Sequence, residues 1–126
     1  MLRSLCAALA AFVLAAPAAA QQLQRNFPQS SLRAELVVVQ PPDVTLNGRA
    51  ARLAPGARIR DANNMLLMSA SVTGQRLLVH YTLDDFGLLK DAWVLRDDEA
   101  AKLWPRTPAE AQRWAFDPLT QGWVRR

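Results

Sequence analysis

The stretch LNGRAARLAPGARIR, residues 46–60, places four arginines in fifteen positions and contains two pairs of turn-forming residues. Asn47-Gly48 is the strongest short signal for a β-hairpin, because both turn positions need a positive φ. A two-residue turn fixes the register, and four cross-strand pairs follow from it: Leu46 with Arg49, Thr45 with Ala50, Val44 with Ala51, and Asp43 with Arg52. The stretch therefore predicts antiparallel strands with one apolar face.

The alternation of inward and outward positions along these strands also predicts where each of the four arginines lies. Arg49 lies at the hairpin tip, and Arg52 lies opposite a carboxylate, which favours a cross-strand ion pair. Pro55-Gly56 predicts the next turn, and beyond it Arg58 and Arg60 face outward. We therefore interpret the arginines as solvated strand faces, and a phosphate-binding patch is the alternative.

The segments around this stretch read as further strands. Residues 34–39, AELVVV, are rich in β-branched side chains and stop at Pro41-Pro42. Residues 65–72 and 75–83 predict a second hairpin that turns at Thr73-Gly74.

In this second hairpin, the register places Met68 opposite Val79 and Ala70 opposite Leu77, so that the apolar faces agree. The other face carries three further side chains: Leu67, Leu78 and His80. That face is too apolar to be fully solvated, so we expect another element to cover part of it.

Turn and helix signals follow. Residues 84–87 read as a turn and residues 88–95 as the last long strand. The segment 96–104 opens with acidic residues suited to a helix N-terminus, and Thr107-Pro108 opens a second helix with a cap and an N1 proline. Residues 116–124 predict a final small hairpin. Because this part of the chain is rich in tryptophan, we expect it to pack against the sheet.

These signals together predict a mainly β fold: a small antiparallel barrel or curved sheet of five to six strands with one or two short C-terminal helices. We expect a single domain over residues 33–126, preceded by a leader over residues 21–32. A chain of 126 residues is too short for two separate cores.

Residues 1–20 are typical of a cleaved secretory signal. A positive start at Arg3 precedes twelve apolar residues, Leu5 to Ala16, and a run of small residues reaches Ala20. The apolar run is shorter than the roughly 20 residues that span a bilayer, and no later run is long enough. We expect cleavage near Ala20 and a periplasmic or secreted protein without a transmembrane segment.

Few residues suit catalysis or metal binding. The only cysteine, Cys6, lies inside the expected signal, and His80 is the only histidine. Alternation places His80 beside Arg76 in a surface setting, and no nucleophile motif accompanies it. Asp84 and Asp85 would point to opposite faces of a strand, so we expect a turn there. We therefore expect no catalytic residue, no metal and no cofactor.

Charge and aromatic residues give weaker signals. The net charge of +4 hints at anionic partners, but 15 basic residues are interleaved with 11 acidic ones. Near the C-terminus, Trp114 and Trp123 lie close to arginines in the sequence, a combination that can stack on sugars or bases. The alternative, which we prefer, is that the tryptophans close one end of the barrel.

Several segments resemble a group of small, uncharacterised exported proteins of β-proteobacteria. The resemblance covers roughly residues 25–95 and rests on four segments: RNFP (25–28), LNGRAARLAPGARIRD (46–61), NNMLLMSASVTGQ (63–75) and VHYTLDDFGLLKDAWVL (79–95). It implies a periplasmic location. It implies no activity, cofactor or site residue.

The leading hypothesis is an exported binding or interaction module without catalytic activity. Its contact surface would be the apolar face near Leu67 and Leu78 or the tryptophan-rich tail, and its partner an envelope protein or an anionic polymer rather than nucleic acid. Two alternatives stay open: an envelope hydrolase that uses His80 with Asp84 or Asp85, and a binder of anionic envelope polymer that uses Arg58, Arg60 and Arg76.

Overall fold

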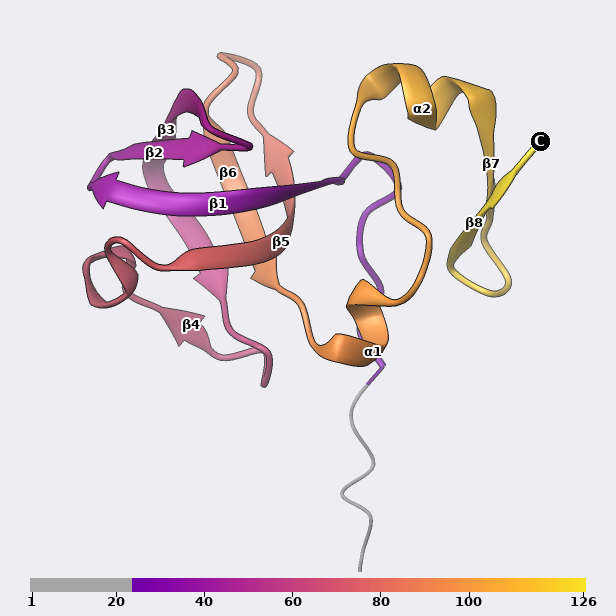
Figure 1. Ribbon diagram of the computed structural model, residues 1–126, viewed down its shortest axis with the longest axis horizontal. Coiled ribbons are helices and arrows are strands. Elements are labelled where there is room, and N and C mark those ends of the chain that lie inside the picture. Colours follow the sequence, from indigo (N-terminus) through magenta and orange to yellow (C-terminus); the bar gives the residue numbers. More distant parts are fainter. Residues whose placement is uncertain (1–23) are drawn as a thin grey trace, which may run out of the picture.

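The computed structural model describes residues 24–126, so the expected signal over residues 1–20 lies outside the described part. Within this part the chain forms a six-stranded sheet, a two-stranded sheet and two short α-helices, which confirms the predicted fold class. Figure 1 shows the larger sheet on the left and the C-terminal helix and hairpin on the right. Neither helix has the length and apolar character that crossing a membrane requires.

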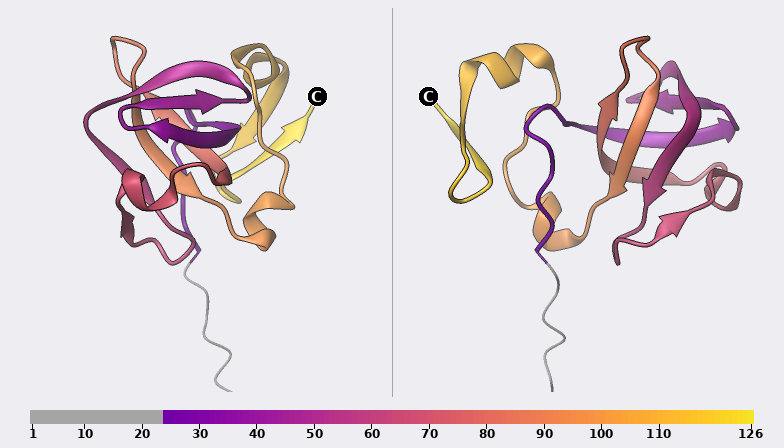
Figure 2. Two further views of the ribbon diagram at one scale, coloured as in Figure 1. Left: turned by 60° about the vertical axis from the view of Figure 1, so that its left-hand side comes forward. Right: turned by 180° about the vertical axis from the view of Figure 1, so that it is seen from behind.

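Five strands of the larger sheet close into a barrel: β1 (Leu32–Gln40), β2 (Asp43–Leu46), β3 (Arg49–Arg60), β5 (Arg76–Leu83) and β6 (Leu89–Val94). The closed order is β1-β2-β3-β6-β5-β1, and every pairing is antiparallel except that of β3 with β6. Figure 2 shows this closure from two further sides. The order is that of the five-stranded Greek-key barrel called the OB fold. Because one fold hosts many functions, function must come from the site.

The β2–β3 hairpin has the predicted register in all four cross-strand pairs. Asn47 and Gly48 have φ values of 52° and 79°, as the turn requires. Asn47 also ties the hairpin tip to β1, since its Oδ1 accepts a hydrogen bond from the Glu35 backbone N–H at 2.9 Å. The predicted ion pair of Arg52 with Asp43 forms across 3.4 Å, with both side chains exposed.

The turn predicted at Pro55-Gly56 is wrong, because β3 runs through it from Arg49 to Arg60. The register with β6 instead shifts between Leu53 and Arg58, and Gly56 has a φ of 76°. A β-bulge tolerates both a proline without an N–H and a glycine with positive φ. The two residues therefore bend the strand and do not end it.

The second predicted hairpin is also wrong. Residues 65–72 contain only the two-residue strand β4 (Leu66–Leu67), which pairs with β3, and the 3₁₀ helix η1 (Ser69–Val72). The neighbours of β5 are β1 and β6, so the pairs Met68–Val79 and Ala70–Leu77 do not exist. Two other pairings therefore override the turn signal at Thr73-Gly74. The pairing of β5 with β1 joins residues far apart in the sequence, and its pairing with β6 forms a different local hairpin.

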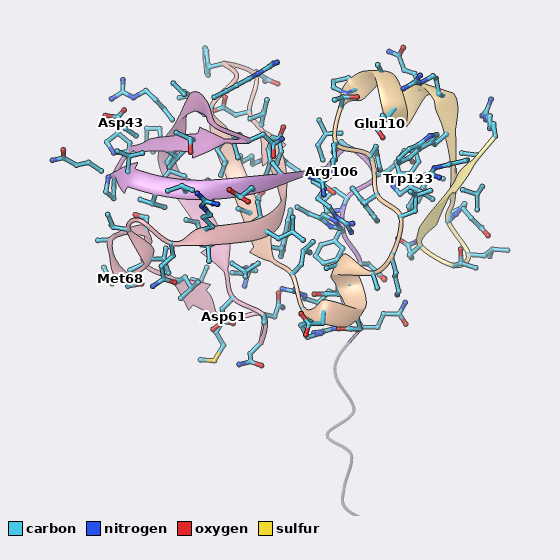
Figure 3. All side chains as sticks on the ribbon, in the orientation of Figure 1. Asp43, Asp61, Met68, Arg106, Glu110 and Trp123 are labelled. Carbon is cyan, nitrogen blue, oxygen red and sulfur yellow. The ribbon has the colours of Figure 1, made fainter. Side chains whose placement is uncertain are left out.

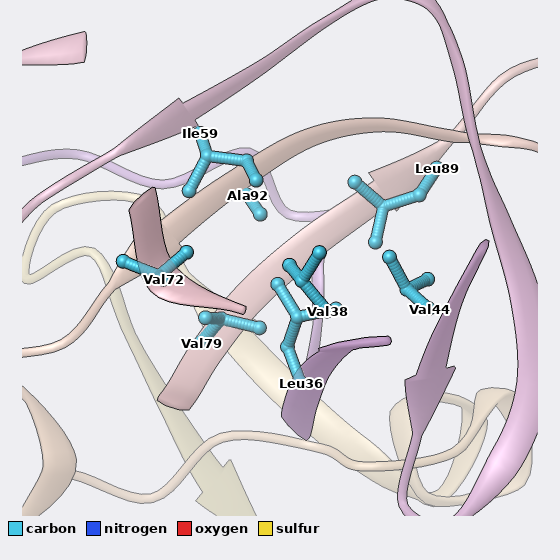
Figure 4. Close-up of a cluster of buried hydrophobic side chains, with 8 residues drawn as sticks. All are labelled: Leu36, Val38, Val44, Ile59, Val72, Val79, Leu89 and Ala92. Carbon is cyan, nitrogen blue, oxygen red and sulfur yellow. The ribbon is translucent and has the colours of Figure 1, made fainter. Parts of the chain in front are cut away.

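The barrel core is a cluster of buried aliphatic side chains, drawn in Figure 4: Leu36, Val38, Val44, Ile59, Val72, Val79, Leu89 and Ala92. Leu67 packs against this core, because β4 places it opposite Ile59. The prediction that Leu67 shares the outer face with Leu78 and His80 is therefore wrong.

The C-terminal segment contains four short elements: α1 (Asp97–Ala100), α2 (Pro108–Arg113), β7 (Trp114–Asp117) and β8 (Gly122–Arg125). The predicted final hairpin is confirmed by the β7–β8 pairing. A second buried cluster, here called the aromatic cluster, contains Phe27, Trp104 and Trp123, with Trp93 of β6 packed against it. The expectation that the C-terminal segment packs against the sheet is thus confirmed.

The cap of α2 allows a first prediction. The Thr107 side chain accepts a hydrogen bond from the Glu110 backbone N–H at 3.1 Å, and proline follows at the first helical position. We expect Thr107→Ala to lower the free energy of unfolding by about 1 kcal/mol, measured by urea denaturation. Thr120→Ala, at an exposed position without a capping role, is the control. Equal effects of the two substitutions would contradict the capping role.

Candidate functional site

The leader from residue 24 to residue 31 passes between the barrel and the C-terminal segment (Figures 1 and 2). We call this region the junction. All the buried polar or charged side chains of residues 24–126 lie there: Arg25, Ser31, Arg33, His80 and Glu99. Burying such groups is unfavourable unless they are paired, so their concentration in one place marks the junction as the candidate site.

His80 is buried at the junction, with 1% of its surface exposed. Its ring stacks on Trp104 at a centroid distance of 4.4 Å, and the edge contact with Phe27 is also 4.4 Å. The predicted surface setting of His80 is therefore wrong. Alternation placed it correctly on the outer face of β5, with Val79 inside, but the side chains that cover this face come from distant parts of the sequence.

Arg33 holds the His80 ring in one protonation state. The two residues lie directly opposite each other on β1 and β5, and Arg33 Nε and Nη2 lie 3.3 Å and 3.2 Å from His80 Nε2. A guanidinium can only donate, so Nε2 accepts and the ring hydrogen is on Nδ1. Burial, followed by the charges of Arg33 and Arg25, lowers the pKa of His80 to about 3. His80 is therefore neutral near pH 7.

The Nδ1 atom of His80 is buried and has no hydrogen-bond partner among the described residues. Since the hydrogen is on this nitrogen, the unpaired group is an N–H donor. A buried donor without an acceptor costs about 1–3 kcal/mol. A buried water or a ligand atom that reaches Nδ1 would remove this cost.

Arg33 is itself a buried cation, with 6% of its surface exposed. Besides His80, it donates to the backbone oxygens of Ala100 and Glu99, both at 3.1 Å. Within residues 24–126, no carboxylate lies at ion-pair distance from Arg33. Burial and the nearby charge of Arg106 lower the pKa of Arg33. The positive charge of Arg33 is thus compensated only by neutral oxygens and an imidazole.

Arg25 and Glu99 form the buried ion pair of the junction. Arg25 Nε donates to Glu99 Oε2 at 2.9 Å, and Arg25 Nη2 donates to Glu99 Oε1. Arg25 also donates to the carbonyls of Asp61 and Val94, at 2.9 Å and 2.8 Å. Glu99 accepts the backbone N–H of Arg96 at 2.9 Å. Through these contacts, the ion pair links the leader to the start of α1 and to the end of β6.

Two pockets open at the junction and share Lys102 and Trp104. The first, called the histidine pocket, has a volume of about 240 Å³, and its walls include Arg25, Phe27, His80, Glu99, Lys102 and Trp104. The second, called the basic pocket, has a volume of about 330 Å³, and its walls include Arg33, Lys102, Arg106, Glu110, Trp114 and Arg125.

The structure separates the arginines that the sequence suggested for anion binding. Arg58 and Arg60 lie on β3 and Arg76 on β5, and these strands do not pair. Arg60 donates to the Asn64 carbonyl at 3.3 Å, and Arg76 lies 3.8 Å from a Glu35 oxygen. None of the three arginines lines either junction pocket.

The other suggested residues are placed as follows. Leu78 is half-buried, and its carbonyl accepts the Leu95 N–H at 2.9 Å. Trp123 is buried in the aromatic cluster. Trp114 is half-buried, with the Arg125 guanidinium 5.5 Å from its ring centroid.

The acidic residues considered for catalysis or metal binding form a turn, as expected. Asp84 Oδ1 accepts the backbone N–H groups of Phe86 and Leu88, both at 2.9 Å. Within residues 24–126, no cluster of three or more His, Cys, Asp or Glu side chains is arranged to hold a metal ion.

Sequence reasoning missed Arg25, Arg33, Glu99 and Trp104. One signal for Arg33 was present, because alternation with the buried residues Ala34 and Leu36 puts it on the outer face of β1. The contact of Arg33 with His80 could not be predicted, because it depends on the β1–β5 pairing, which the sequence did not indicate.

Comparison with known proteins returns no match: no family model fits the chain, and neither a curated protein nor a solved structure is significantly similar to it. The junction must therefore be interpreted from its own chemistry.

Proposed function

We propose that this protein is an exported binding module of the cell envelope, without catalytic activity, that holds its ligand at the junction. The observation that carries the proposal is His80 itself. This residue lines the histidine pocket, its neutral ring is fixed by Arg33, and its buried Nδ1–H has no partner among the described residues. The export part rests on the pattern of residues 1–20.

The same geometry argues against the hydrolase alternative. A general base needs a free lone pair, but His80 Nε2 accepts from Arg33 and Nδ1 carries the hydrogen. A pKa of about 3 also makes His80 a weak base. Asp84 is not placed to orient the ring, because its Oδ1 accepts the backbone N–H groups of Phe86 and Leu88 and so closes the turn after β5.

The histidine pocket has the composition of a small recognition site. Phe27 and Trp104 supply apolar walls, His80 supplies one donor, and Lys102 supplies a cation without an ion-pair partner among the described residues. At about 240 Å³ it is smaller than the pockets of roughly 300–1,000 Å³ that hold drug-sized ligands. It therefore suits a small molecule or a terminal group of a larger partner that carries a hydrogen-bond acceptor.

Polymer binding through Arg58, Arg60 and Arg76 has less support. These side chains lie on strands that are not neighbours, and Arg76 is already close to a carboxylate. Affinity for a polyanion rises when several cations lie on one continuous surface. Arg58 and Arg60 do not form such a surface with Arg76.

The proposal can be tested by NMR, because His80 is the only histidine. With the protein labelled with ¹⁵N in its imidazole, we expect a neutral ring with hydrogen on Nδ1 between pH 5 and 8. We also expect the ring signals to shift saturably when a low-molecular-mass filtrate of periplasm is added. His80→Gln keeps an acceptor for Arg33 and removes the Nδ1–H, so this variant should bind the filtrate component more weakly.

A parallel assay addresses the hydrolase alternative. We expect no saturable hydrolysis of p-nitrophenyl acetate by the protein. Saturable hydrolysis that His80→Gln abolishes would overturn the proposal in favour of an enzyme. An unchanged ring spectrum at every filtrate concentration would overturn ligand binding at the histidine pocket.

A further inference from the structure

We propose that the basic pocket binds a phosphate monoester, the dianionic group of a sugar phosphate or of a lipid headgroup. This inference rests on the proposed function of a binding module. It adds a second site and a ligand class to it.

The first argument is the charge of the pocket walls. Arg33, Lys102, Arg106 and Arg125 line the pocket, and Glu110 is the one carboxylate among the lining residues, which leaves an excess of three positive charges. Within residues 24–126, none of the four cations has a carboxylate at ion-pair distance. A concave surface lined by one sign of charge concentrates ions of the opposite sign.

The second argument is the burial of Arg33 without a counter-ion. Its four hydrogen-bond contacts account for at most four of the five N–H groups of a guanidinium. A buried charge that lacks an ionic partner is unfavourable, and the charge of Arg106 adds repulsion that lowers the pKa of Arg33. An anion in the pocket would compensate both cations at once.

The third argument is that the walls are held in place. The Trp104 indole N–H donates to the Ser31 carbonyl at 2.8 Å, and the Arg125 guanidinium lies over the Trp114 ring. Figure 3 places Arg106 between the barrel and the C-terminal segment. Cations positioned before binding lose little conformational entropy when an anion arrives.

The size of the charge excess favours a dianion. A single carboxylate would neutralise only one of the three excess charges, whereas a phosphate monoester carries about −1.5 to −2 at pH 7. Arginine donates to phosphate oxygens in pairs. Arg106 and Arg125 can supply such pairs, and Arg33 can add a further N–H. The volume of about 330 Å³ leaves room for a sugar ring or an acyl stem beside the tryptophans.

Isothermal titration calorimetry of the full protein tests the proposal with glucose 6-phosphate as the soluble probe. Gluconate, a monoanion of similar size, and glucose are the comparison ligands. Vesicles with phosphatidic acid, a phosphate monoester, are compared with vesicles of phosphatidylglycerol, a phosphodiester. We expect binding to glucose 6-phosphate or to phosphatidic acid to exceed binding to the matched monoanion by about tenfold or more. Binding of glucose 6-phosphate alone would identify a soluble sugar phosphate as the source of the group. Binding of phosphatidic acid vesicles alone would identify a lipid headgroup.

Three variants locate the binding. Arg106→Gln and Arg125→Gln each remove one exposed cation of the pocket, and each should weaken binding about tenfold or more. Arg58→Gln removes the same charge from the exposed face of β3, outside the pocket, and should change binding less than twofold. All three positions are exposed, so the variants should fold normally.

Equal binding of gluconate and glucose 6-phosphate would overturn the ligand class. Equal weakening by Arg58→Gln and Arg106→Gln, or no binding of any phosphate probe, would overturn the site. None of these outcomes would contradict the proposed function, because that function is tested separately by the NMR signals of the His80 ring at the histidine pocket.

Discussion

Replacing Glu99 by glutamine is expected to lower the free energy of unfolding by about 3–5 kcal/mol, the usual loss when one partner of a buried ion pair is removed. The substitution leaves the Arg25 guanidinium buried without a counter-charge. It also weakens the acceptor of the Arg96 backbone N–H at the start of α1. The midpoint and slope of urea denaturation, followed by tryptophan fluorescence, measure the loss.

Two further variants control this experiment. Asp98→Asn removes an exposed carboxylate one position away, and it should leave the midpoint nearly unchanged. The double variant Arg25→Met, Glu99→Leu removes both charges, and we expect it to be more stable than Glu99→Gln. If Glu99→Gln behaved like Asp98→Asn, the buried ion pair would contribute little to stability.

Acidification is expected to destabilise the protein through His80. Its pKa is about 3 in the folded state, lowered first by burial and then by Arg33 and Arg25, against about 6.5 in an unfolded chain. As the pH falls below 6.5, the unfolded state takes up a proton and the folded state does not, so stability falls until the pH nears 3. Between pH 6 and pH 4 the loss from this one group should be about 2–3 kcal/mol.

Comparison with His80→Gln isolates this contribution from that of the carboxylates. The variant cannot titrate at position 80 and keeps an acceptor for Arg33, so its stability should fall less steeply with pH. The measurement is urea denaturation of both proteins at half-unit steps from pH 7 to pH 4. Parallel curves would show that His80 titrates normally in the folded state and is not held neutral by its surroundings.

The parts of the fold that depend on local chemistry could be predicted from the sequence. The Asn47-Gly48 turn fixed the β2–β3 register, and Thr107-Pro108 marked the start of α2. The same logic failed at Pro55-Gly56 and Thr73-Gly74. At Pro55-Gly56, the parallel pairing of β3 with β6 continues the strand through a bulge. At Thr73-Gly74, β5 pairs with the distant strand β1 and forms its hairpin with β6 instead.

The junction could not be predicted for the same physical reason. Its buried ion pair joins Arg25 to Glu99 across 74 positions of the chain, and no periodicity or motif marks residues that meet only after the barrel has closed. The sequence predicted partial cover of the strand face that carries His80 but a surface setting for His80 itself. The residues that bury it, Phe27 and Trp104, belong to the leader and to the C-terminal segment, which the sequence did not place there.

The leader that threads between the barrel and the C-terminal segment also constrains the order of folding. Arg25 acquires its partner only once Glu99 is available, and the parallel β3–β6 pairing likewise waits for residues beyond 88. Contacts of such high sequence separation slow the search for the native state. When a chain emerges from its N-terminus, β1, β2 and β3 can pair early, but the barrel cannot close before β6 has emerged. Closure of the barrel and burial of the Arg25–Glu99 pair are therefore late steps of folding, which wait for residues 89–99.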